Sequence, residues 1–435
     1  MARLDILTAN DRPGEYPGSY YAATATPLAP FAEATGEISC DVAVIGGGFT
    51  GLSAALHLAE AGMDVVVLEA HRVGFGASGR NGGQVHPGQR VDQDDLEKMV
   101  GAEMARRLWD VAVESVDLTI ELAQRHAPEA GYVPGLIHAD HRARFVAHSH
   151  AYAEKLARDY GYDKIAPLSR DEMRAKVATD AYFGGLEDTG GGHLHPLNYA
   201  LGLARAATAA GARIFERSRV EWVSESEPVR LGTGKAKVTA RYLLWAANGY
   251  LGHLDKRIAA KVMPINNFIL ATEPLGALAD ELIAENQAVA DSKFVINYFR
   301  LSQDRRMLFG GGESYGYRFP ADIAAKARAP MLEIFPQLGD ARIDYAWGGT
   351  LGITMNRMPH FERIAGNILT AGGYSGHGVA LATLGGKLAA EAMLGQAERF
   401  DLMAEVPTLR FPGGPAMRSP LLVLAMLWFS LRDKL

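Results

Sequence analysis

The sequence predicts an α/β protein with a Rossmann-like domain that is discontinuous along the chain and a second, α+β domain built on a mostly antiparallel sheet. Three observations lead to this prediction. A strand, a glycine turn, a helix and a second strand follow one another from Asp41 to Glu69. Strands that end in small residues return near 241–249 and 367–378, and a run of extended segments lies between these two returns. Such returns indicate one nucleotide-binding sheet that is interrupted by a second domain.

A glycine motif joins the first strand to the first helix. Apolar, β-branched residues are followed by Gly46, Gly48 and Gly51 at GxGxxG spacing. Gly46 permits the tight turn, Gly48 lets a pyrophosphate approach the backbone, and Gly51 lets the helix and strand pack closely. The helix begins near Phe49 and Thr50, where free N–H groups and the positive end of the helix dipole favour phosphates.

The second strand, at 64–68, is followed by Glu69 and Ala70. A carboxylate at the end of this strand can accept a hydrogen bond from a ribose hydroxyl. The alternative is a glycine-rich turn that binds nothing. The order of strand, glycines, helix, strand and acid disfavours that alternative, because it reproduces the full context of a dinucleotide site.

A glycine-rich loop occupies 74–84. Its glycines exclude a stable helix or a central strand, so its backbone is open to a ligand. A pyrophosphate or the edge of a flavin ring would suit the donors between the glycines, whereas a flexible linker seldom carries an Arg-Asn pair. The candidate cofactor-binding residues of this loop are Ser78, Gly79, Arg80, Asn81, Gly82 and Gln84.

The chain then leaves the first sheet and returns to it. Helical patterns at 92–126 and 140–160, with a short strand at 132–139, carry no nucleotide signature and belong to a second domain. A helix at 196–210 and a buried strand at 241–247 lead back. Small residues at the end of that strand let a cofactor lie across it. The candidate cofactor-binding residues here are Val220, Ala247, Asn248 and Gly249.

Three extended segments, at 268–271, 294–299 and 307–309, predict the antiparallel sheet of a substrate domain. In the middle segment Tyr298 and Arg300 share a face, because side chains alternate along a strand. An aromatic ring that packs an amine and a guanidinium that binds a carboxylate would suit an active site. The alternative is a pair on the solvent face of the sheet.

Histidines supply further candidates. His86, just past the glycine-rich loop, either faces the substrate or caps a backbone carbonyl, and the sequence leaves both open. His193 and His195 have no third ligand at useful spacing, so we interpret them as loop histidines and predict no metal site.

The last structured unit, from 367 onward, is another strand, glycine turn and helix. Gly376, His377 and Gly378 therefore place a second helix N-terminus beside a ligand. A nicotinamide dehydrogenase needs one Rossmann unit, whereas this chain returns twice and contributes a glycine turn near its far end. A larger ligand held at both ends fits better, and FAD is such a ligand.

Composition bounds the classes of function. The chain has 435 residues, of which 48% are hydrophobic and 22% charged, with a net charge of −6, so nothing indicates a nucleic-acid surface. Cys40 is the single cysteine, which excludes an internal disulfide, and we interpret it as core packing. The polar segment 1–39 lacks the apolar core of a signal peptide, which predicts a cytoplasmic protein.

One apolar segment, Leu421–Phe429, is too short to span a bilayer, which needs about 20 apolar residues. We predict a helix there that packs on the protein or on a partner subunit. Peripheral membrane contact is the alternative that we favour less.

These segments resemble the D-amino-acid-oxidase-type flavoprotein superfamily. Within it, the chain is similar to the γ-glutamylputrescine oxidase group, which also includes pipecolate and related amine oxidases. The resemblance covers essentially the whole chain, and its flavin motifs are specific to the superfamily. It is carried by residues 19–23, 41–53, 76–84, 245–250 and 373–378, with softer matches at 298–300 and 334–338.

The resemblance implies a discontinuous FAD-binding domain at 1–95, 191–255 and 346–435, and a substrate domain at 96–190 and 256–345 that roofs the flavin. It also implies oxidation of an amine. A hydride leaves the carbon next to a neutral amine for flavin N5 and gives an imine that water hydrolyses. Oxygen or another acceptor then reoxidises the flavin.

The resemblance assigns a part of the cofactor to each motif. It places the ADP half on the glycine motif and the acid after the second strand, and it places the flavin's pyrimidine side near the second helix N-terminus, which would stabilise the negative charge of reduced flavin. The matching residues are Gly46, Gly48, Gly51 and Glu69 for ADP, Ser78, Arg80, Asn81 and Gln84 along the pyrophosphate toward the ring, Val220 at the adenine, Ala247 and Gly249 at the strand end, and Gly376, His377 and Gly378 at the pyrimidine.

Two departures from the family matter. Some relatives attach FAD through a cysteine in the segment that matches 347–352, and the absence of one here predicts non-covalent FAD. Some oxidases place a lysine over the flavin near what is here 306–310. The absence of a lysine in that stretch leaves an oxidase and a dehydrogenase both open.

We therefore predict an FAD-dependent amine oxidoreductase that acts on γ-glutamylputrescine or a similar N-substituted amine. An L-pipecolate- or sarcosine-type amino-acid oxidase or dehydrogenase is one alternative, and a non-catalytic flavin-binding subunit is another. The sequence fixes neither the amine, nor the electron acceptor, nor whether the chain forms a homo-oligomer.

Overall fold

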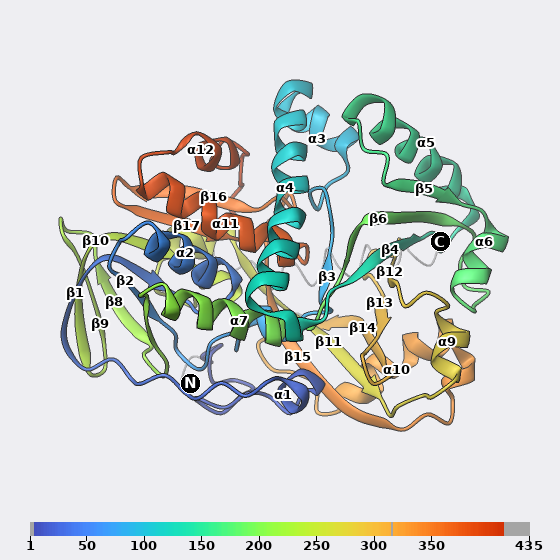
Figure 1. Ribbon diagram of the computed structural model, residues 1–435, viewed down its shortest axis with the longest axis horizontal. Coiled ribbons are helices and arrows are strands. Elements are labelled where there is room, and N and C mark those ends of the chain that lie inside the picture. The colour runs from blue at the N-terminus through green and yellow to red at the C-terminus, as the bar shows by residue number, and fades with distance from the viewer. Residues whose placement is uncertain (1–3, 315, 413–435) are drawn as a thin grey trace.

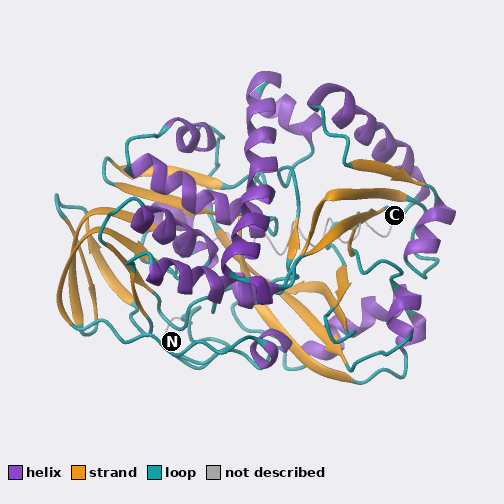
Figure 2. Ribbon diagram, in the orientation of Figure 1, coloured by secondary structure: helices purple, strands orange, loops and turns teal. Residues whose placement is uncertain are grey.

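The computed structural model describes residues 4–314 and 316–412, and it contains two sheets with helices packed around them (Figure 1). Figure 2 shows that strands and helices occur in both halves of the molecule. In the described residues, no helix has both the length and the apolar character needed to cross a membrane. The apolar segment Leu421–Phe429, for which we predicted a helix, lies outside the described residues.

The first sheet contains the glycine motif. Its path is β16–β17–β10–β1–β2–β7, and β9 with β8 pairs onto β10. The strands from β17 to β7 run parallel, as expected for buried strands rich in Val, Leu and Ile. The bounds are β1 (Gly36–Ile45), β2 (Val65–Leu68), β7 (Arg213–Phe215), β8 (Val220–Ser224), β9 (Val229–Thr233), β10 (Ala236–Trp245), β16 (His360–Ala365) and β17 (Ile368–Gly372).

Helices cover one face of this sheet, and α2 lies between α7 and α11 (Figure 1). Because α2 is covered on both sides, almost all of its residues are buried. Gly386 permits the close approach of α11, since a Cβ there would lie 2.3 Å from the carbonyl oxygen of Thr50. The bounds are α2 (Phe49–Glu60), α4 (Ala102–His126), α7 (Pro196–Ala209), α11 (Gly378–Met393) and α12 (Glu398–Ala404).

The single helix that we predicted at 92–126 is wrong. The structure has two helices, α3 (Gln93–Val100) and α4, which separate at Gly101. Gly101 has φ of 84°, a left-handed conformation that ends a helix and that glycine adopts without strain. The break lets α4 turn onto α7 and α11, so the second of the two helices packs on the layer that covers the first sheet.

The second sheet has the order β15–β11–β14–β13–β12–β4–β6–β3, with β5 on β6. All of its pairs are antiparallel except β12 with β4, which confirms the prediction of a mostly antiparallel sheet. Its strands are β3 (Gln84–Val85), β4 (Val133–Ala139), β5 (Ile165–Leu168), β6 (Gly185–His193), β11 (Met263–Thr272), β12 (Ala288–Asp291), β13 (Tyr298–Leu301), β14 (Met307–Ser314) and β15 (Ile343–Ile353).

An aromatic cluster forms the core beneath this sheet. The rings of Phe299 and Phe309 stack with centroids 5.7 Å apart, and Phe335 meets Phe299 edge-on at 5.0 Å. Such pairs add to the stability that burial alone gives. The helices around the sheet are α5 (Ala143–Tyr160), α6 (Arg170–Lys176), α8 (Lys256–Lys261), α9 (Leu278–Leu282) and α10 (Ile323–Ile334).

Two predictions about this sheet need correction. Residues 347–352 do not return to the first sheet, because they pair with β11 throughout as part of β15. The domain border that we expected at residue 345 therefore falls inside β15. Residues 294–297 lie outside the strands, and β13 begins only at Tyr298. The glycines in β15 serve close packing instead of a strand end, since a Cβ on Gly348 would lie 2.8 Å from the ring of Phe319.

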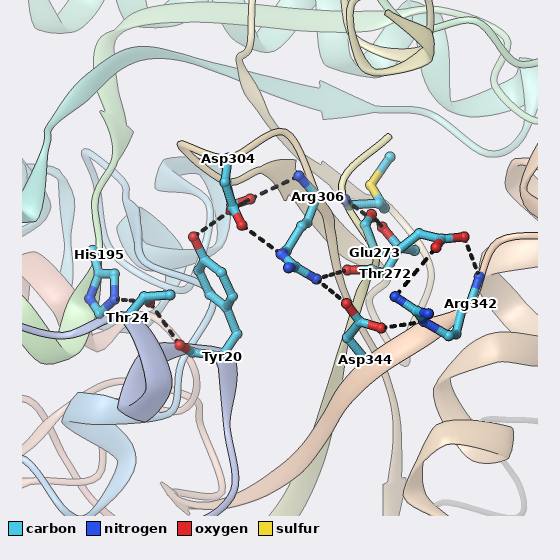
Figure 3. Close-up of polar contacts among 11 residues, drawn as sticks. Tyr20, Thr24, His195, Thr272, Glu273, Asp304, Arg306, Arg342 and Asp344 are labelled. Carbon is cyan, nitrogen blue, oxygen red and sulfur yellow. Dashed lines mark hydrogen bonds and ion pairs between the residues drawn. The ribbon is translucent and has the colours of Figure 1, made fainter. Parts of the chain in front are cut away.

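A short N-terminal helix, α1 (Tyr20–Thr24), links the two layers through a polar network (Figure 3). The Tyr20 hydroxyl donates to Asp304 at 2.7 Å, and Thr24 Oγ1 lies 3.1 Å from His195 Nε2 at the start of α7. Arg306 lies between two carboxylates, because Nε donates to Asp304 at 2.6 Å and Nη1 to Asp344 at 2.5 Å. The network therefore joins the turn between β13 and β14 to both β15 and α1.

We expect Arg306→Met to lower the free energy of unfolding by about 1–2 kcal/mol, because the substitution removes the cation shared by Asp344, which is 20% exposed, and Asp304, which is 43% exposed. The side chain of Arg306 is itself 13% exposed. Arg342 contacts the same Asp344 but is 70% exposed, so Arg342→Met should lower the free energy of unfolding by clearly less. Urea unfolding of both variants beside the parent measures the difference. An equal decrease in the free energy of unfolding in the two variants would contradict the central role of Arg306.

Candidate active site

A cavity of about 380 Å³ lies where the glycine-rich loop and the start of α11 meet the second sheet. It collects candidates that are far apart in the sequence. Of the residues predicted to bind the cofactor or the substrate, those that line this cavity are Arg80, Asn81, Gly82, Gln84, His86, Tyr298, Gly376 and His377.

A second cavity, of about 710 Å³, lies beside β8 and the end of β10. Val220, Asn248 and Gly249 line it, the last two within a 3₁₀ turn at Asn248–Tyr250. The remaining predicted cofactor residues, all in the described part of the chain, are not among the residues that line either cavity. They are Gly46, Gly48, Phe49, Thr50, Gly51, Glu69, Ala70, Ser78, Gly79, Ala247 and Gly378.

The glycine turn leaves no room for side chains. Gly46 has φ of +113°, and a Cβ on it would lie 2.7 Å from the carbonyl oxygen of Ala246. A Cβ on Gly51 would lie 1.9 Å from the carbonyl oxygen of Gly46, and one on Gly48 would lie 2.8 Å from Ser78 Oγ. The turn therefore touches the end of β10 on one side and the glycine-rich loop on the other.

Glu69 sits beside this turn. Its carboxylate accepts hydrogen bonds from the backbone N–H groups of Gly47 at 2.7 Å and His71 at 2.8 Å. Burial raises the pKa of Glu69 to about 7, against the opposing effect of these bonds. The side chain is only partly buried, so a hydroxyl group of a bound ligand can still reach it.

Arg80 ties the glycine-rich loop to its surroundings. Its Nε donates to the carbonyl oxygen of Phe75 at 2.7 Å, and its Nη1 donates to Gly348 O and to Asp11 Oδ1, both at 3.1 Å. The remaining nitrogen, Nη2, is buried and has no hydrogen-bond partner in the described part of the chain. A buried guanidinium nitrogen without a partner is costly, so this atom indicates a bound acceptor.

Asn81 shapes the loop from within. Its Nδ2 donates to the carbonyl oxygens of Ala77 and Ser78, at 2.9 and 3.0 Å, and its Oδ1 accepts from the N–H of Gly83 at 2.7 Å. The side-chain amide is therefore occupied by the loop itself. Ala77, the first residue of the 3₁₀ turn Ala77–Gly79, lines the cavity together with Asn81.

The start of α11 forms the opposite wall. His377 is the N-cap of this helix and makes no side-chain capping bond, so the first N–H groups of α11 are not capped by it. Ser375 precedes it with φ of 54° and is held by its N–H, which donates to Gly352 O at 2.9 Å. A long helix thus directs the positive end of its dipole at the cavity.

These features fit FAD. The glycine turn would accept a pyrophosphate, Glu69 could take a ribose hydroxyl, and the Nη2 atom of Arg80 and the start of α11 offer positive charge to the flavin end. The turn contacts the end of β10 and the glycine-rich loop, and residues that follow β10 line one cavity while residues of the loop line the other. Which of these residues contact the cofactor stays a prediction.

Tyr298 is packed into the cavity wall. Its ring covers two glycines, since a Cβ on Gly82 or Gly310 would lie 2.7 or 2.1 Å from it. Its hydroxyl donates a short hydrogen bond to Asn267 Oδ1, and both residues line the cavity. Tyr298 therefore joins the glycine-rich loop to the strands β11 and β14.

Arg300, which we predicted to bind a substrate carboxylate, makes its hydrogen bonds inside the protein. Four of its five N–H groups donate there: Nε donates to Gly82 O at 2.6 Å, and Nη2 donates to Leu194 O at 3.0 Å and to Tyr21 Oη at 3.2 Å. Its Nη1 donates to Leu301 O at 3.2 Å. The side chain is 5% exposed and positions the loop, because buried guanidinium groups are stable only when their donors are satisfied.

His86 has a defined tautomer. Gln84 Nε2 donates to the carbonyl oxygen of Val289 at 2.9 Å, so Gln84 Oε1 faces His86 Nε2 at 2.9 Å. An amide oxygen only accepts, so Nε2 of His86 carries the proton and Nδ1 is an acceptor. Nδ1 is buried and has no hydrogen-bond partner among residues 4–314 and 316–412. Burial and the nearby charges of His377, His138 and Arg90 hold the pKa of His86 well below its usual range, so the ring is neutral.

His193 and His195 do not form a metal pair. His193 Nε2 donates to Asn286 O at 2.7 Å, whereas His195 Nδ1 accepts from the N–H of Asn198 at 3.1 Å and caps α7. Burial and the charge of Arg300 lower the pKa of each to about 3. In the described residues, no group of three or more His, Cys, Asp or Glu side chains is placed to hold a metal ion.

Cys40 lies on β1, where burial raises the pKa of its thiol to about 12. It does not line the main cavity, and the segment that matches the cysteine of some relatives instead provides Gly349 and Leu351 to the wall. Trp347, also from that segment, donates its Nε1–H to the carbonyl oxygen of Arg80 at 3.0 Å. Non-covalent FAD stays a prediction that this geometry supports.

Sequence reasoning missed several cavity residues. Asp140 directly follows β4, Asn267 lies on β11 and Tyr152 lies on α5, and no motif marks any of them. The one available signal is a polar residue at a strand end, since Asp140 comes after the apolar run Leu136–Ala139. Tertiary contacts bring these side chains to the cavity, so spacing along the chain does not reveal them.

Comparison with known proteins places these observations in context. The family model described as FAD dependent oxidoreductase matches residues 41–392. The chain is 43% identical over 423 residues to the gamma-glutamylputrescine oxidoreductase of Escherichia coli (strain K12), covering 97% of this chain and 99% of that protein. It is 42% identical over 417 residues to the probable oxidoreductase OrdL of Rhizobium meliloti (strain 1021), covering 96% and 97% of the two chains.

A solved structure shows the same fold. The glycine oxidase from Geobacillus kaustophilus superposes with a TM-score of 0.72 at 21% identity, covering 85% of this chain and 99% of that one. At this identity the likeness establishes the fold and not the substrate.

We expect the affinity of the apoprotein for FAD to rise with pH if Glu69 accepts the ribose hydroxyl. The ionised carboxylate is the better acceptor, and its pKa of about 7 means that binding below pH 7 must first remove a proton. The dissociation constant should therefore be up to about tenfold lower at pH 8 than at pH 6. Quenching of flavin fluorescence during titration measures this.

The matched control is Glu69→Gln, which cannot ionise. It should bind FAD more weakly and show a flat profile over the same range. A pH dependence that is the same in both proteins would show that another group is responsible. FAD that stays attached after acid precipitation would contradict non-covalent binding.

Proposed function

The chain belongs to the FAD dependent oxidoreductase family, and from this membership we propose that it oxidises γ-glutamylputrescine or a similar N-substituted amine. The observation that carries the proposal is the relative named for this substrate, which matches over nearly the full length of both chains. Features of the main cavity support the same choice.

FAD, when bound, supplies the acceptor for a hydride from the carbon next to the amine. The protein must then hold the amine in place, keep it uncharged and exclude water. Strands of the second sheet and helix α5 form part of the wall of the main cavity, and loops that include 86–92 form another part. The strands and the helix are rigid elements suited to such positioning. Tyr298 and Asn267 fix part of its wall through their mutual hydrogen bond.

His86 is suited to hold the reacting amine. Its ring is neutral, and the bond to Gln84 fixes Nδ1 as an acceptor. An acceptor binds an N–H of the amine and leaves the nitrogen lone pair available, which loss of a hydride from the adjacent carbon requires. A charged imidazolium would repel an ammonium group, so a lowered pKa serves this role.

The hydrogen bonds of Arg300 within the protein argue against an amino-acid substrate. In pipecolate and sarcosine the carboxylate is attached to a carbon that is bonded to the reacting nitrogen, so a site for them needs a cation close by. Arg300 was the candidate for that cation, and its donors are occupied by Gly82, Leu194, Leu301 and Tyr21. In γ-glutamylputrescine the carboxylate lies far from the reacting amine, which removes this requirement.

Anaerobic mixing with candidate substrates tests the proposal. We expect γ-glutamylputrescine to bleach the flavin absorbance rapidly, and putrescine, pipecolate and sarcosine to do so slowly or not at all. Bleaching by pipecolate or sarcosine alone would overturn the proposal in favour of an amino-acid substrate. A yellow protein that no amine bleaches would favour a flavin-binding subunit. Because the segment 306–310 has no lysine, the sequence leaves the electron acceptor open. Recovery of the flavin absorbance after admission of air would show that oxygen is the acceptor.

We expect His86→Phe to lower kcat/KM for the amine substrate by about tenfold or more, because one well-placed hydrogen bond contributes roughly that factor. FAD content and the flavin spectrum should stay unchanged. The matched variant Gln84→Met leaves the ring but removes the bond that fixes its tautomer, so we expect a smaller loss. Unchanged kcat/KM in His86→Phe would show that this histidine does not contact the amine.

A further inference from the structure

Asp140 is a buried carboxylate that no part of the proposed reaction uses. It directly follows β4 and lines the main cavity, and the residue is 4% exposed. Its backbone is fixed on both sides: its N–H donates to the carbonyl oxygen of Gly184 and its carbonyl accepts from the N–H of Phe183, both at 2.9 Å. The position of the side chain is therefore set by a rigid strand end.

This carboxylate is incompletely satisfied. Ser149 donates a side-chain hydrogen bond to it, but Oδ2 is buried and has no hydrogen-bond partner in the described structure. A buried carboxylate oxygen without a donor is costly, so its retention beside a cavity indicates a ligand that supplies the donor.

Two neighbouring carboxylates on the cavity wall differ from Asp140. Asp188 accepts hydrogen bonds from Tyr162 Oη at 2.6 Å and from the N–H of Gly190 at 2.9 Å. Asp291 accepts from the N–H and the side-chain amide of Asn297, at 2.9 and 2.8 Å. Both therefore have donors from the protein. Asp140 differs from both in having a buried oxygen that lacks a donor among the described residues.

We propose that Asp140 binds the second, non-reacting ammonium group of the substrate. The proposal rests on the proposed function, in which the substrate is an extended amine with a charged tail. An ionised carboxylate only accepts hydrogen bonds, and it attracts a cation more strongly than a neutral donor. His86 and Asp140 line one continuous cavity, so a single substrate can contact both.

The effect of such a contact falls on binding more than on chemistry. An ammonium group in the tail is equally charged before and during loss of the hydride, so its contact is as strong in the ground state as in the transition state. Removal of the contact should therefore raise KM and leave kcat nearly unchanged. This pattern distinguishes a specificity residue from one that acts at the reacting carbon.

The test compares γ-glutamylputrescine with N-glutarylputrescine, which has the same reacting amine and the same carboxylate but lacks the tail ammonium. In Asp140→Asn we expect kcat/KM for γ-glutamylputrescine to fall about tenfold to hundredfold through KM, since breaking a buried charged contact has an effect of this order. For N-glutarylputrescine it should change less than threefold, a bound close to experimental scatter. Asp159→Asn, an exposed carboxylate at the end of α5, is the matched control and should behave as the parent.

A second readout does not depend on turnover. Calorimetric titration of the chemically reduced enzyme with γ-glutamylputrescine should show about tenfold weaker binding or more in Asp140→Asn. Asp140→Glu keeps the charge and should retain part of the preference for the substrate with two ammonium groups. Retained FAD and an unchanged circular dichroism spectrum establish that both variants fold.

Equal losses for both substrates in Asp140→Asn would overturn the proposal, because the residue would then act on the reacting amine or on the fold. No loss for either substrate would also overturn it. Failure of the proposed function shows differently, since the parent enzyme itself would then oxidise neither compound. A parent that prefers γ-glutamylputrescine, together with a variant that has lost this preference, would support the assignment.

Discussion

The buried guanidinium of Arg300 is the interaction on which the site depends. It projects from β13 of the second sheet and donates to the carbonyl of Gly82 in the glycine-rich loop, to the carbonyl of Leu194 before α7, and to the hydroxyl of Tyr21 in α1. One cation thus connects the roof, the loop and the helical layer over the first sheet. Its 5% exposure makes each of these bonds costly to leave unmade, so the loop has one stable position relative to the roof.

The N-terminal segment completes this connection. The ring of Tyr21 meets Trp347 edge-on at 5.2 Å, and Trp347 donates to the carbonyl oxygen of Arg80. Asp11, from the same segment, pairs with the Arg80 side chain, and both groups are almost fully buried. The short motif that begins at Ser19 is therefore explained by packing: it supplies an aromatic wedge where loop, roof and helices meet.

How far the sequence predicts this molecule follows from where the controlling forces lie. The strand and helix around Gly46 were predicted because turn chemistry and apolar patterning are local. The break at Gly101, the placement of Trp347 in the second sheet and the internal bonding of Arg300 were not predicted, because each depends on contacts between distant segments. A histidine or arginine near a flavin motif can stabilise the fold or take part in the reaction. Its hydrogen-bond partners distinguish the two roles, and the sequence does not show them.

The cavity has an uneven distribution of polar groups that follows from these constraints. The glycine-rich loop and the start of α11 offer N–H groups and positive dipole, whereas the wall formed by the ends of β4 and β12 carries carboxylates. His86, which is neutral, also lines the cavity. Its hydrogen bond to Gln84 fixes Nδ1 as an acceptor. The loop and the start of α11 favour an anionic cofactor, and the ends of β4 and β12 favour a cationic substrate. In each case a desolvated charged group meets the opposite charge. The same buried strand ends that hold the sheets together therefore determine which way round the two ligands bind.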